Sequence, residues 1–159
     1  IIVNDILDKD LEKNINRRSG DTEYYNKKNK YFPLFISETM NSIILPISGK
    51  GLWSSLFGYV AINAKNYSTV NGITFYAHGE TPGLGAEISK DWFKSNFVGK
   101  DIYKDGNLVS VRVTKAGMAN KSSSYEVDGI SGATITSNGV EELLKRDLEK
   151  YEPYFNRNK

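Results

Sequence analysis

Residues 59–75 read Tyr-Val-Ala-Ile-Asn-Ala-Lys-Asn-Tyr-Ser-Thr-Val-Asn-Gly-Ile-Thr-Phe, and this stretch decides the fold. Its two ends are rich in β-branched and aromatic residues, which favour strands. The polar residues 66–68 separate these ends. Two strand-like runs joined by a short polar segment predict a hairpin or near-hairpin, and therefore an antiparallel sheet.

Further strand signals lie on both sides of this hairpin. Residues 109–113 alternate between apolar and polar side chains, and we expect them to pair with a second short run at residues 125–127. Residues 31–36 and 43–46 are short apolar runs, each interrupted by a proline. Because proline cannot donate to a β-ladder, we expect edge strands at these two places.

The clearest helix signal lies near the C-terminus. Asn138 and Glu141 have the spacing of a capping box, and Pro153 marks the expected end of the helix. Between them an apolar stripe follows the helical period, formed by Val140, Leu143, Leu144, Leu148 and Tyr151. A shorter helix is expected from a cap at Ser89 to a stop near Gly99.

The N-terminal segment shows a second helical pattern. Residues 1–15 carry apolar side chains at helical spacing, which predicts a helix. Residues 17–30 are polar and contain the turn signal Ser19-Gly20-Asp21, so we expect a connector there. Together these patterns predict an α+β fold, with a twisted, mostly antiparallel sheet flanked by helices at both chain ends.

The composition limits the possible functions. The 159 residues carry a net charge of +2, which is too small to indicate a nucleic-acid-binding surface. The chain has no cysteine, which excludes disulfides, thiolate metal sites, iron–sulfur clusters and cysteine nucleophiles. With His78 as the single histidine, we predict no metal site. We therefore expect any chemistry to depend on a bound cofactor.

Residues 128–137, Asp-Gly-Ile-Ser-Gly-Ala-Thr-Ile-Thr-Ser, directly precede the C-terminal helix. Small residues, hydroxyls and the free N–H groups of a helix start together favour a phosphate. Such a contact contributes about 0.3–1 kcal/mol when exposed, so it orients a phosphate more than it holds one. Ordinary helix capping explains the same residues. The pattern of a nucleotide-binding P-loop is absent.

Residues 76–87, Tyr-Ala-His-Gly-Glu-Thr-Pro-Gly-Leu-Gly-Ala-Glu, form the second informative segment. Three glycines and a proline after a strand predict a tight loop with exposed backbone donors and acceptors. Such a loop suits a flat heteroaromatic ring, with N–H groups from Thr81 and Leu84. An ordinary glycine-rich connector is the alternative interpretation. For His78 we expect a structural role.

Taken together, the two segments resemble those of FMN-binding domains. Asp128-x-x-Ser131-Gly132-Ala133-Thr134 is similar to the flavinylation motif, and residues 79–85 are similar to the partner loop. Within this family the chain resembles the C subunits of sodium-translocating NADH:quinone oxidoreductases, where an acid is usual at the position of Glu87. Ala86 departs from the commoner glycine.

The resemblance implies that Thr134 carries FMN through a phosphoester bond, made by a separate magnesium-dependent flavin transferase. Recognition by that transferase is expected at Asp128, Ser131, Gly132 and Ala133. For Asp128 itself, orienting the loop, completing the transferase's metal site and simple turn formation all remain open. The expected cofactor-binding residues are Trp53, Glu80, Thr81, Gly83, Leu84, Gly85, Ser131, Gly132, Ala133 and Thr136.

The resemblance also implies an organisation and a location. Residues 1–30 are expected to be an N-terminal helix and connector that follow a missing transmembrane helix, and residues 31–159 the FMN-binding domain. This domain is expected on the periplasmic side of the bacterial inner membrane, with the other subunits of the complex as partners and no nucleic acid. The implied function is that of an electron carrier in a sodium-pumping respiratory complex, without turnover of its own. The alternatives are one of the G subunits of Rnf-type ferredoxin:NAD oxidoreductases and a flavin-free binding or scaffold module.

Overall fold

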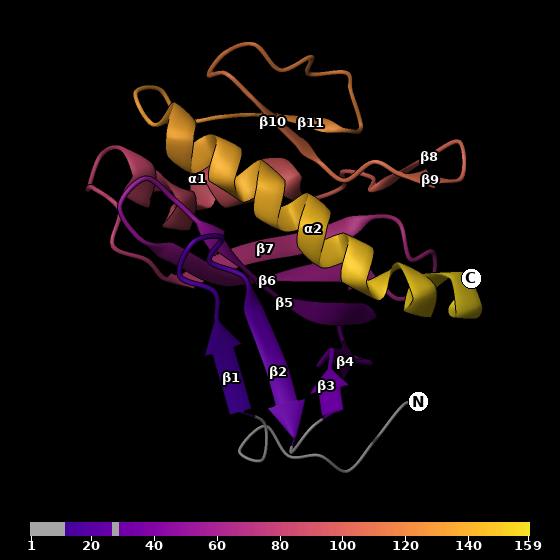
Figure 1. The fold of residues 1–159 in the computed structure, drawn as a ribbon. Helices are drawn as coiled ribbons and strands as arrows, with labels where there is room; N and C mark the ends of the chain where they lie inside the picture. The colour runs from indigo at the N-terminus through magenta and orange to yellow at the C-terminus, as the bar shows by residue number, and fades with distance from the viewer. Residues whose placement is uncertain (1–11, 27–28) are drawn as a thin grey trace.

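The computed structural model describes residues 12–26 and 29–159 (Figure 1). The helical segments are η2 (Gly85–Ser89), α1 (Asp91–Lys94), η3 (Ser95–Phe97) and α2 (Thr134–Asn158). The strands are β1 (Glu12–Ile15), β2 (Thr22–Asn26), β3 (Asn29–Tyr31), β4 (Phe35–Ser37), β5 (Ser42–Lys50), β6 (Ser55–Asn63), β7 (Val70–Ala77), β8 (Tyr103–Lys104), β9 (Asn107–Leu108), β10 (Arg112–Thr114) and β11 (Glu126–Asp128).

The largest sheet is antiparallel, with the strand order β4-β5-β6-β7, and α2 crosses one of its faces (Figure 1). Along β6, buried residues alternate with half-buried ones, as expected for a strand with one face on the core. The helix contributes a buried stripe that includes Val140, Leu144 and Leu148. The predicted α+β fold with a mostly antiparallel sheet is therefore confirmed.

The hairpin predicted from residues 59–75 is present as the antiparallel pair β6 and β7. The edge position predicted for residues 43–46 is wrong, because they lie inside β5, between β4 and β6. However, β4 pairs only with residues 42–44. Where β5 reaches Pro46 it therefore has a strand partner on one side alone, which a residue without a backbone donor tolerates.

The second predicted strand pair is present as β10 and β11, but these two strands run parallel. Residues 115–125 carry the chain back to the start of the pair, which permits the parallel arrangement. The helix predicted from Ser89 to Gly99 is broken into η2, α1 and η3. The break occurs at Lys90, whose backbone is extended, so Ser89 ends η2 instead of capping a helix.

The N-terminal prediction is wrong where the structure can be compared with it. Residues 1–11, most of the predicted helix, lie outside the described residues, and the remaining four form β1. The connector predicted at residues 17–30 instead contains β2 and most of β3, which complete a three-stranded antiparallel sheet. The predicted turn signal lies between β1 and β2, where Gly20 has a φ of 71°. Here strand pairing across a tight turn determines the structure, and the helical spacing of a few apolar residues does not.

Helix α2 extends beyond its predicted bounds at both ends. It begins at Thr134 rather than after Asn138, and it continues past Pro153. The proline removes one backbone hydrogen bond, but the following turn buries Phe155 completely, with its ring 6.2 Å from that of Tyr67. This burial offsets the lost bond, so the predicted stop at Pro153 is wrong.

Helix α2 comes close to the sheet at Gly139. A β-carbon on this residue would lie 2.1 Å from the carbonyl oxygen of Lys50. Alanine is normally better than glycine inside a helix by about 1 kcal/mol, but here the overlap would force α2 away from β5. We predict that Gly139→Ala lowers the free energy of unfolding, measured in urea, by about 1–3 kcal/mol. The control is Gly72→Ala, where a β-carbon would meet no atom within 4 Å; equal losses in the two variants would contradict the prediction.

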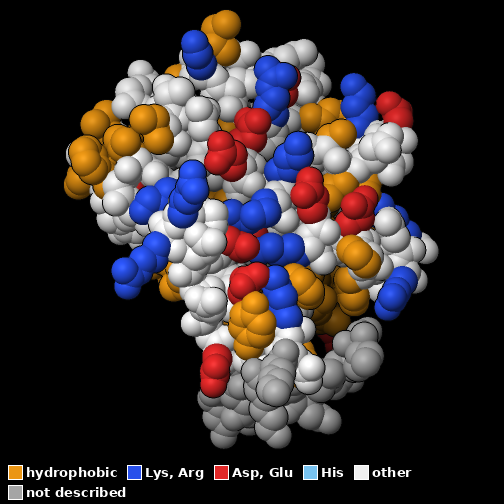
Figure 2. Space-filling view, in the orientation of Figure 1, with side chains coloured by type: hydrophobic (Ala, Val, Ile, Leu, Met, Phe, Trp, Pro, Cys, Tyr) orange, Lys and Arg blue, Asp and Glu red, His pale blue; other side chains and the backbone are white. Residues whose placement is uncertain are grey.

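Acidic and basic side chains lie next to one another on the face that α2 covers (Figure 2). The buried centre of this charge network is Asp147, which is 2% exposed and forms ion pairs with Arg146 and Lys150. Both cations also reach Asp21 in the turn between β1 and β2. The backbone N–H of Ser48 in β5 donates to Asp147 Oδ2 at 2.8 Å. One buried carboxylate thus connects β5, α2 and the N-terminal sheet.

Candidate functional site

The first residue of α2, Thr134, is exposed, and its hydroxyl makes no hydrogen bond with any residue that the structure describes. The first turn of the helix contains no acidic side chain. Its N–H groups and the positive end of the helix dipole are therefore available to an anion. A phosphate on the Thr134 hydroxyl would lie at this helix start without displacing an existing contact.

Ser137 and Gly132 shape the turn ahead of Thr134. The Ser137 hydroxyl accepts from the Ile130 N–H at 3.0 Å and donates to the Ala133 carbonyl at 2.9 Å, which closes the turn. Gly132 has a φ of 76°, and a β-carbon on it would lie 3.0 Å from Leu84 Cδ2. No role was predicted for Ser137 from the sequence. Its signal is a hydroxyl four residues after the carbonyl that it bonds, the usual back-bonding distance for serine in a helix.

A narrow cleft of about 30 Å³ lies between this turn and the glycine-rich loop. That volume is far below the roughly 300–1,000 Å³ that is typical of ligand pockets, so a flavin ring cannot enter the cleft and would have to lie across its opening. Leu84 and Trp53, which are 42% and 68% exposed, offer apolar surface there. The lining residues are Leu52, Trp53, Glu80, Thr81, Leu84, Gly85, Gly132, Ala133 and Thr136.

The structure brings together most of the residues predicted to bind the cofactor. Two residues of the predicted set, Gly83 and Ser131, do not line the cleft. Gly83 lies in the glycine-rich loop, and Ser131 lies in the turn before α2. Leu52 lines the cleft and was not predicted. Its sequence signal is its place directly before Trp53, in a glycine-rich stretch that follows a strand.

The glycine-rich loop satisfies much of its own hydrogen bonding. The N–H groups of Leu84 and Ala86 both donate to the Thr81 carbonyl at 3.1 Å, so the expectation that the Leu84 N–H is available to a ring is wrong. His78 Nδ1 accepts from the Glu80 N–H at 3.3 Å, and Nε2 lies 2.7 Å from the Ser89 hydroxyl. These contacts support the structural role expected for the histidine.

Glu80 directs its carboxylate into the protein. It is 6% exposed and accepts hydrogen bonds from the Thr136 hydroxyl and from backbone N–H groups of residues 52–54. Burial acts to raise the pKa of Glu80, but the hydrogen bonds from Thr136, Trp53 and Ser54 together outweigh it, so the pKa is lowered. The carboxylate is thus ionised at neutral pH.

Asp128 and Ser131 differ in what they contact. Asp128 Oδ1 accepts from the Ala119 N–H at 2.9 Å, so this carboxylate orients the loop between β10 and β11. Ser131 is exposed and makes no hydrogen bond within the described part of the chain, which leaves it accessible to another protein.

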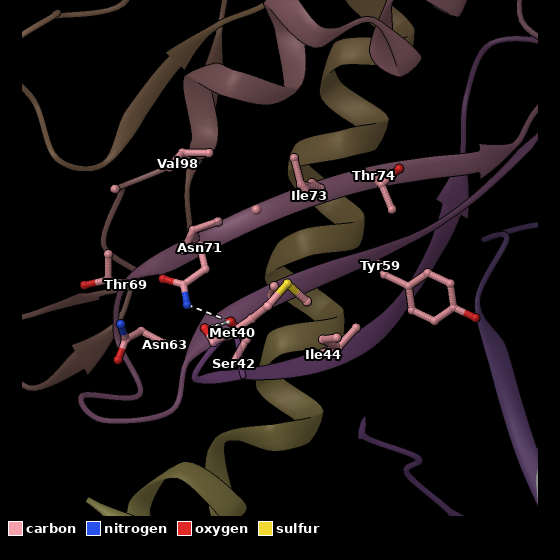
Figure 3. A pocket seen from close by; sticks show the side chains of 14 residues that line it. Met40, Ser42, Ile44, Tyr59, Asn63, Thr69, Asn71, Ile73, Thr74 and Val98 are labelled. Carbon is pink, nitrogen blue, oxygen red and sulfur yellow. Dashed lines mark hydrogen bonds between the residues drawn. The ribbon is translucent and has the colours of Figure 1, made fainter. Parts of the chain in front are cut away.

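A larger hollow of about 720 Å³ lies on the other face of the four-stranded sheet (Figure 3). Met40, Ile44 and Tyr59 line it, and α2 passes behind the sheet in this view. None of the predicted site residues lines this hollow. The sheet therefore separates it from the helix face, and it is not the site predicted from the sequence.

A comparison with protein-family models finds the FMN-binding domain at residues 51–149. The match includes the glycine-rich loop, the turn before α2 and Thr134. The chain belongs to the FMN-binding domain family. Membership in this family supports FMN as the cofactor.

Relatives of this FMN-binding domain include the C subunits of Na(+)-translocating NADH-quinone reductases. The relative from Yersinia pestis is 47% identical over 102 residues, which are 64% of this chain and 38% of that protein. The crystal structure of the relative from Parabacteroides distasonis has a TM-score of 0.72 and 41% identity, covering 78% of this chain and 62% of that one. NqrC from Shewanella oneidensis has a TM-score of 0.67 and 30% identity, covering 86% and 58%. This chain therefore spans less than two thirds of the length of each.

Proposed function

We propose that this chain is the flavin-bearing domain of an NqrC-type subunit of a sodium-translocating NADH:quinone oxidoreductase, with FMN joined through its phosphate to Thr134. The observation that carries the proposal is the exposed Thr134 hydroxyl, which has no partner among the described residues and opens a helix of 25 residues. The similarity to the C subunits of NADH-quinone reductases supports this complex over an Rnf-type complex.

FMN supplies reversible electron transfer when it is bound, and the residues of this chain hold and orient it. The N–H groups in the first turn of α2 would hold the phosphate, and the exposed side chains of Leu84, Trp53 and Leu52 would offer apolar surface to the ring. Because the cleft is too small to enclose a ring, its residues would hold the cofactor at the surface, within reach of the redox group of a partner subunit. A covalent tether keeps the effective concentration high, so weak contacts with the ring suffice.

Attachment requires a separate flavin transferase in this proposal. A threonine hydroxyl is a weak nucleophile without a base, and His78 is already in contact with Ser89 and Glu80. Among the residues expected to be recognised by the transferase, Ser131 and Gly132 are exposed beside Thr134, whereas Ala133 is buried. Asp128 would then act indirectly, through the loop that it orients.

The location is also part of the proposal. We place this domain on the extracytoplasmic side of the bacterial inner membrane, with residues 31–159 as the FMN-binding domain and residues 1–30 leading to it from a membrane anchor. Its partners are the other subunits of the complex. In the described ranges, 12–26 and 29–159, no helix is both long enough and apolar enough to span a membrane.

The test is the intact mass of the full-length protein after co-production with the flavin transferase. We expect a gain of one FMN less one water, and a peptide map that places the adduct at Thr134. A folded protein of unmodified mass would favour the flavin-free scaffold module. Pigment that dissociates on denaturation would contradict the covalent bond while leaving FMN binding intact.

A further inference from the structure

Glu80 forms an unusually dense set of hydrogen bonds for one carboxylate. Oε1 accepts from the Trp53 N–H, the Ser54 N–H and the Ser54 hydroxyl, each at 3.0 Å. Oε2 accepts from the Leu52 N–H at 3.1 Å and from the Thr136 hydroxyl at 2.6 Å. No lysine, arginine or histidine of the described chain lies within ion-pair distance of it. Neutral donors alone therefore hold a buried negative charge.

The neighbouring backbone leaves space for this carboxylate at two glycines. A β-carbon on Gly51 would lie 2.6 Å from Glu80 Oε1. A β-carbon on Gly85 would lie 2.7 Å from both Glu80 Oε2 and Thr136 Oγ1. A side chain at either position would displace the carboxylate. Gly51, after β5, and Gly85, in the loop, therefore both make room for the hydrogen bonds of Glu80.

The hydrogen bonds of Glu80 join three separate segments of the candidate site. Thr136 lies in the first turn of α2, two residues after Thr134. Leu52 and Trp53 line the cleft, and Glu80 itself begins the glycine-rich loop that also lines it. Ser54 adds a second link, because its hydroxyl also accepts from the Gly79 N–H at 2.7 Å. The relative position of Trp53, the loop and the helix start thus depends on one side chain.

We propose that Glu80 is the positioning residue of the flavin site, which fixes the wall at residues 52–54 and the first turn of α2 without itself touching the flavin. This inference rests on the proposed attachment of FMN at Thr134. Glutamine cannot replace the glutamate, because its NH₂ group would face donors where an oxygen now accepts. With FMN attached at Thr134, the uncompensated charge would lie near the flavin, and a negative charge there disfavours the addition of electrons to the ring.

The test uses the full-length flavinylated protein with Glu80→Gln and, as a matched control, Glu87→Gln. Glu87 lies in the same region, and its carboxylate accepts from Trp92 Nε1 at 2.8 Å. We expect Glu80→Gln to weaken the visible circular dichroism of the flavin and to shift its midpoint potential to more positive values. Glu87→Gln should leave both close to wild type. Wild-type values of both signals in a folded Glu80→Gln protein, or equal changes in the two variants, would overturn the proposal.

A second pair of variants decides the matter if Glu80→Gln does not fold. Thr136→Val removes only the hydroxyl that donates to Glu80, and it should weaken the visible circular dichroism in the same direction. Thr136→Ser keeps the hydroxyl and should restore the signal. An unchanged signal in Thr136→Val would overturn the proposal. Absence of covalent flavin from the wild-type protein would instead contradict the attachment at Thr134, so the two failures are distinguishable.

Discussion

Thr134→Ala, co-produced with the flavin transferase, is expected to yield a folded protein with no flavin fluorescence on a denaturing gel. The hydroxyl is the proposed acceptor atom, so its removal leaves nothing to which the phosphate could be joined. Folding should persist, because Thr134 is exposed and its hydroxyl has no partner in the described part of the molecule. For such a surface position the free energy of unfolding is expected to change by no more than about 0.5 kcal/mol.

The matched control for this experiment is Thr74→Ala. Thr74 is an exposed threonine that lines the hollow on the other face of the sheet, so it tests for any general effect of losing a surface hydroxyl. The control should retain full in-gel fluorescence. Fluorescence that survives in Thr134→Ala would move the attachment to another side chain, and loss of fluorescence in both variants would show that the assay reports folding or expression.

Some features of the candidate site could be recognised from the sequence, and others could not. The two loops could be recognised because glycines, hydroxyls and a helix start indicate a binding loop from neighbouring residues alone. The direction of the Glu80 carboxylate could not, because its donors come from segments 26 to 56 residues away along the chain. Glu80, which the sequence predicts to contact the cofactor, is therefore proposed to position the residues around the site instead.

Two errors in the bounds of α2 share this cause, since each depends on contacts distant in sequence. Asn138 and Gly139 are typical of a helix start, yet both lie within α2, and glycine is required at position 139 because the distant Lys50 carbonyl leaves no room for a β-carbon. Pro153 is tolerated because Phe155 is buried against a distant loop. The periods of apolar residues identified the hairpin and α2, but they did not determine where α2 begins or ends.

Asp147→Ala is expected to cause the largest loss of stability among these variants, about 3–5 kcal/mol in the free energy of unfolding. Its removal would leave the buried N–H of Ser48 without an acceptor and Arg146 and Lys150 without their shared anion. Both cations keep a partner in Asp21 and some contact with water, so the value should lie toward the lower end of that range. Urea denaturation at neutral pH measures it.

Two further variants separate the buried charge from general effects of substitution in α2. Asp147→Asn retains an oxygen that can accept from Ser48, so it should lose less stability than Asp147→Ala. Glu149→Ala, at an exposed position on the same helix, should change the free energy of unfolding by no more than about 0.5 kcal/mol. Because Arg146 and Lys150 link Asp147 to Asp21 in the turn between β1 and β2, the loss of Asp147 should also speed amide hydrogen exchange in β1 and β2. Exchange that stays slow there would mean that the N-terminal sheet is held to α2 by other contacts.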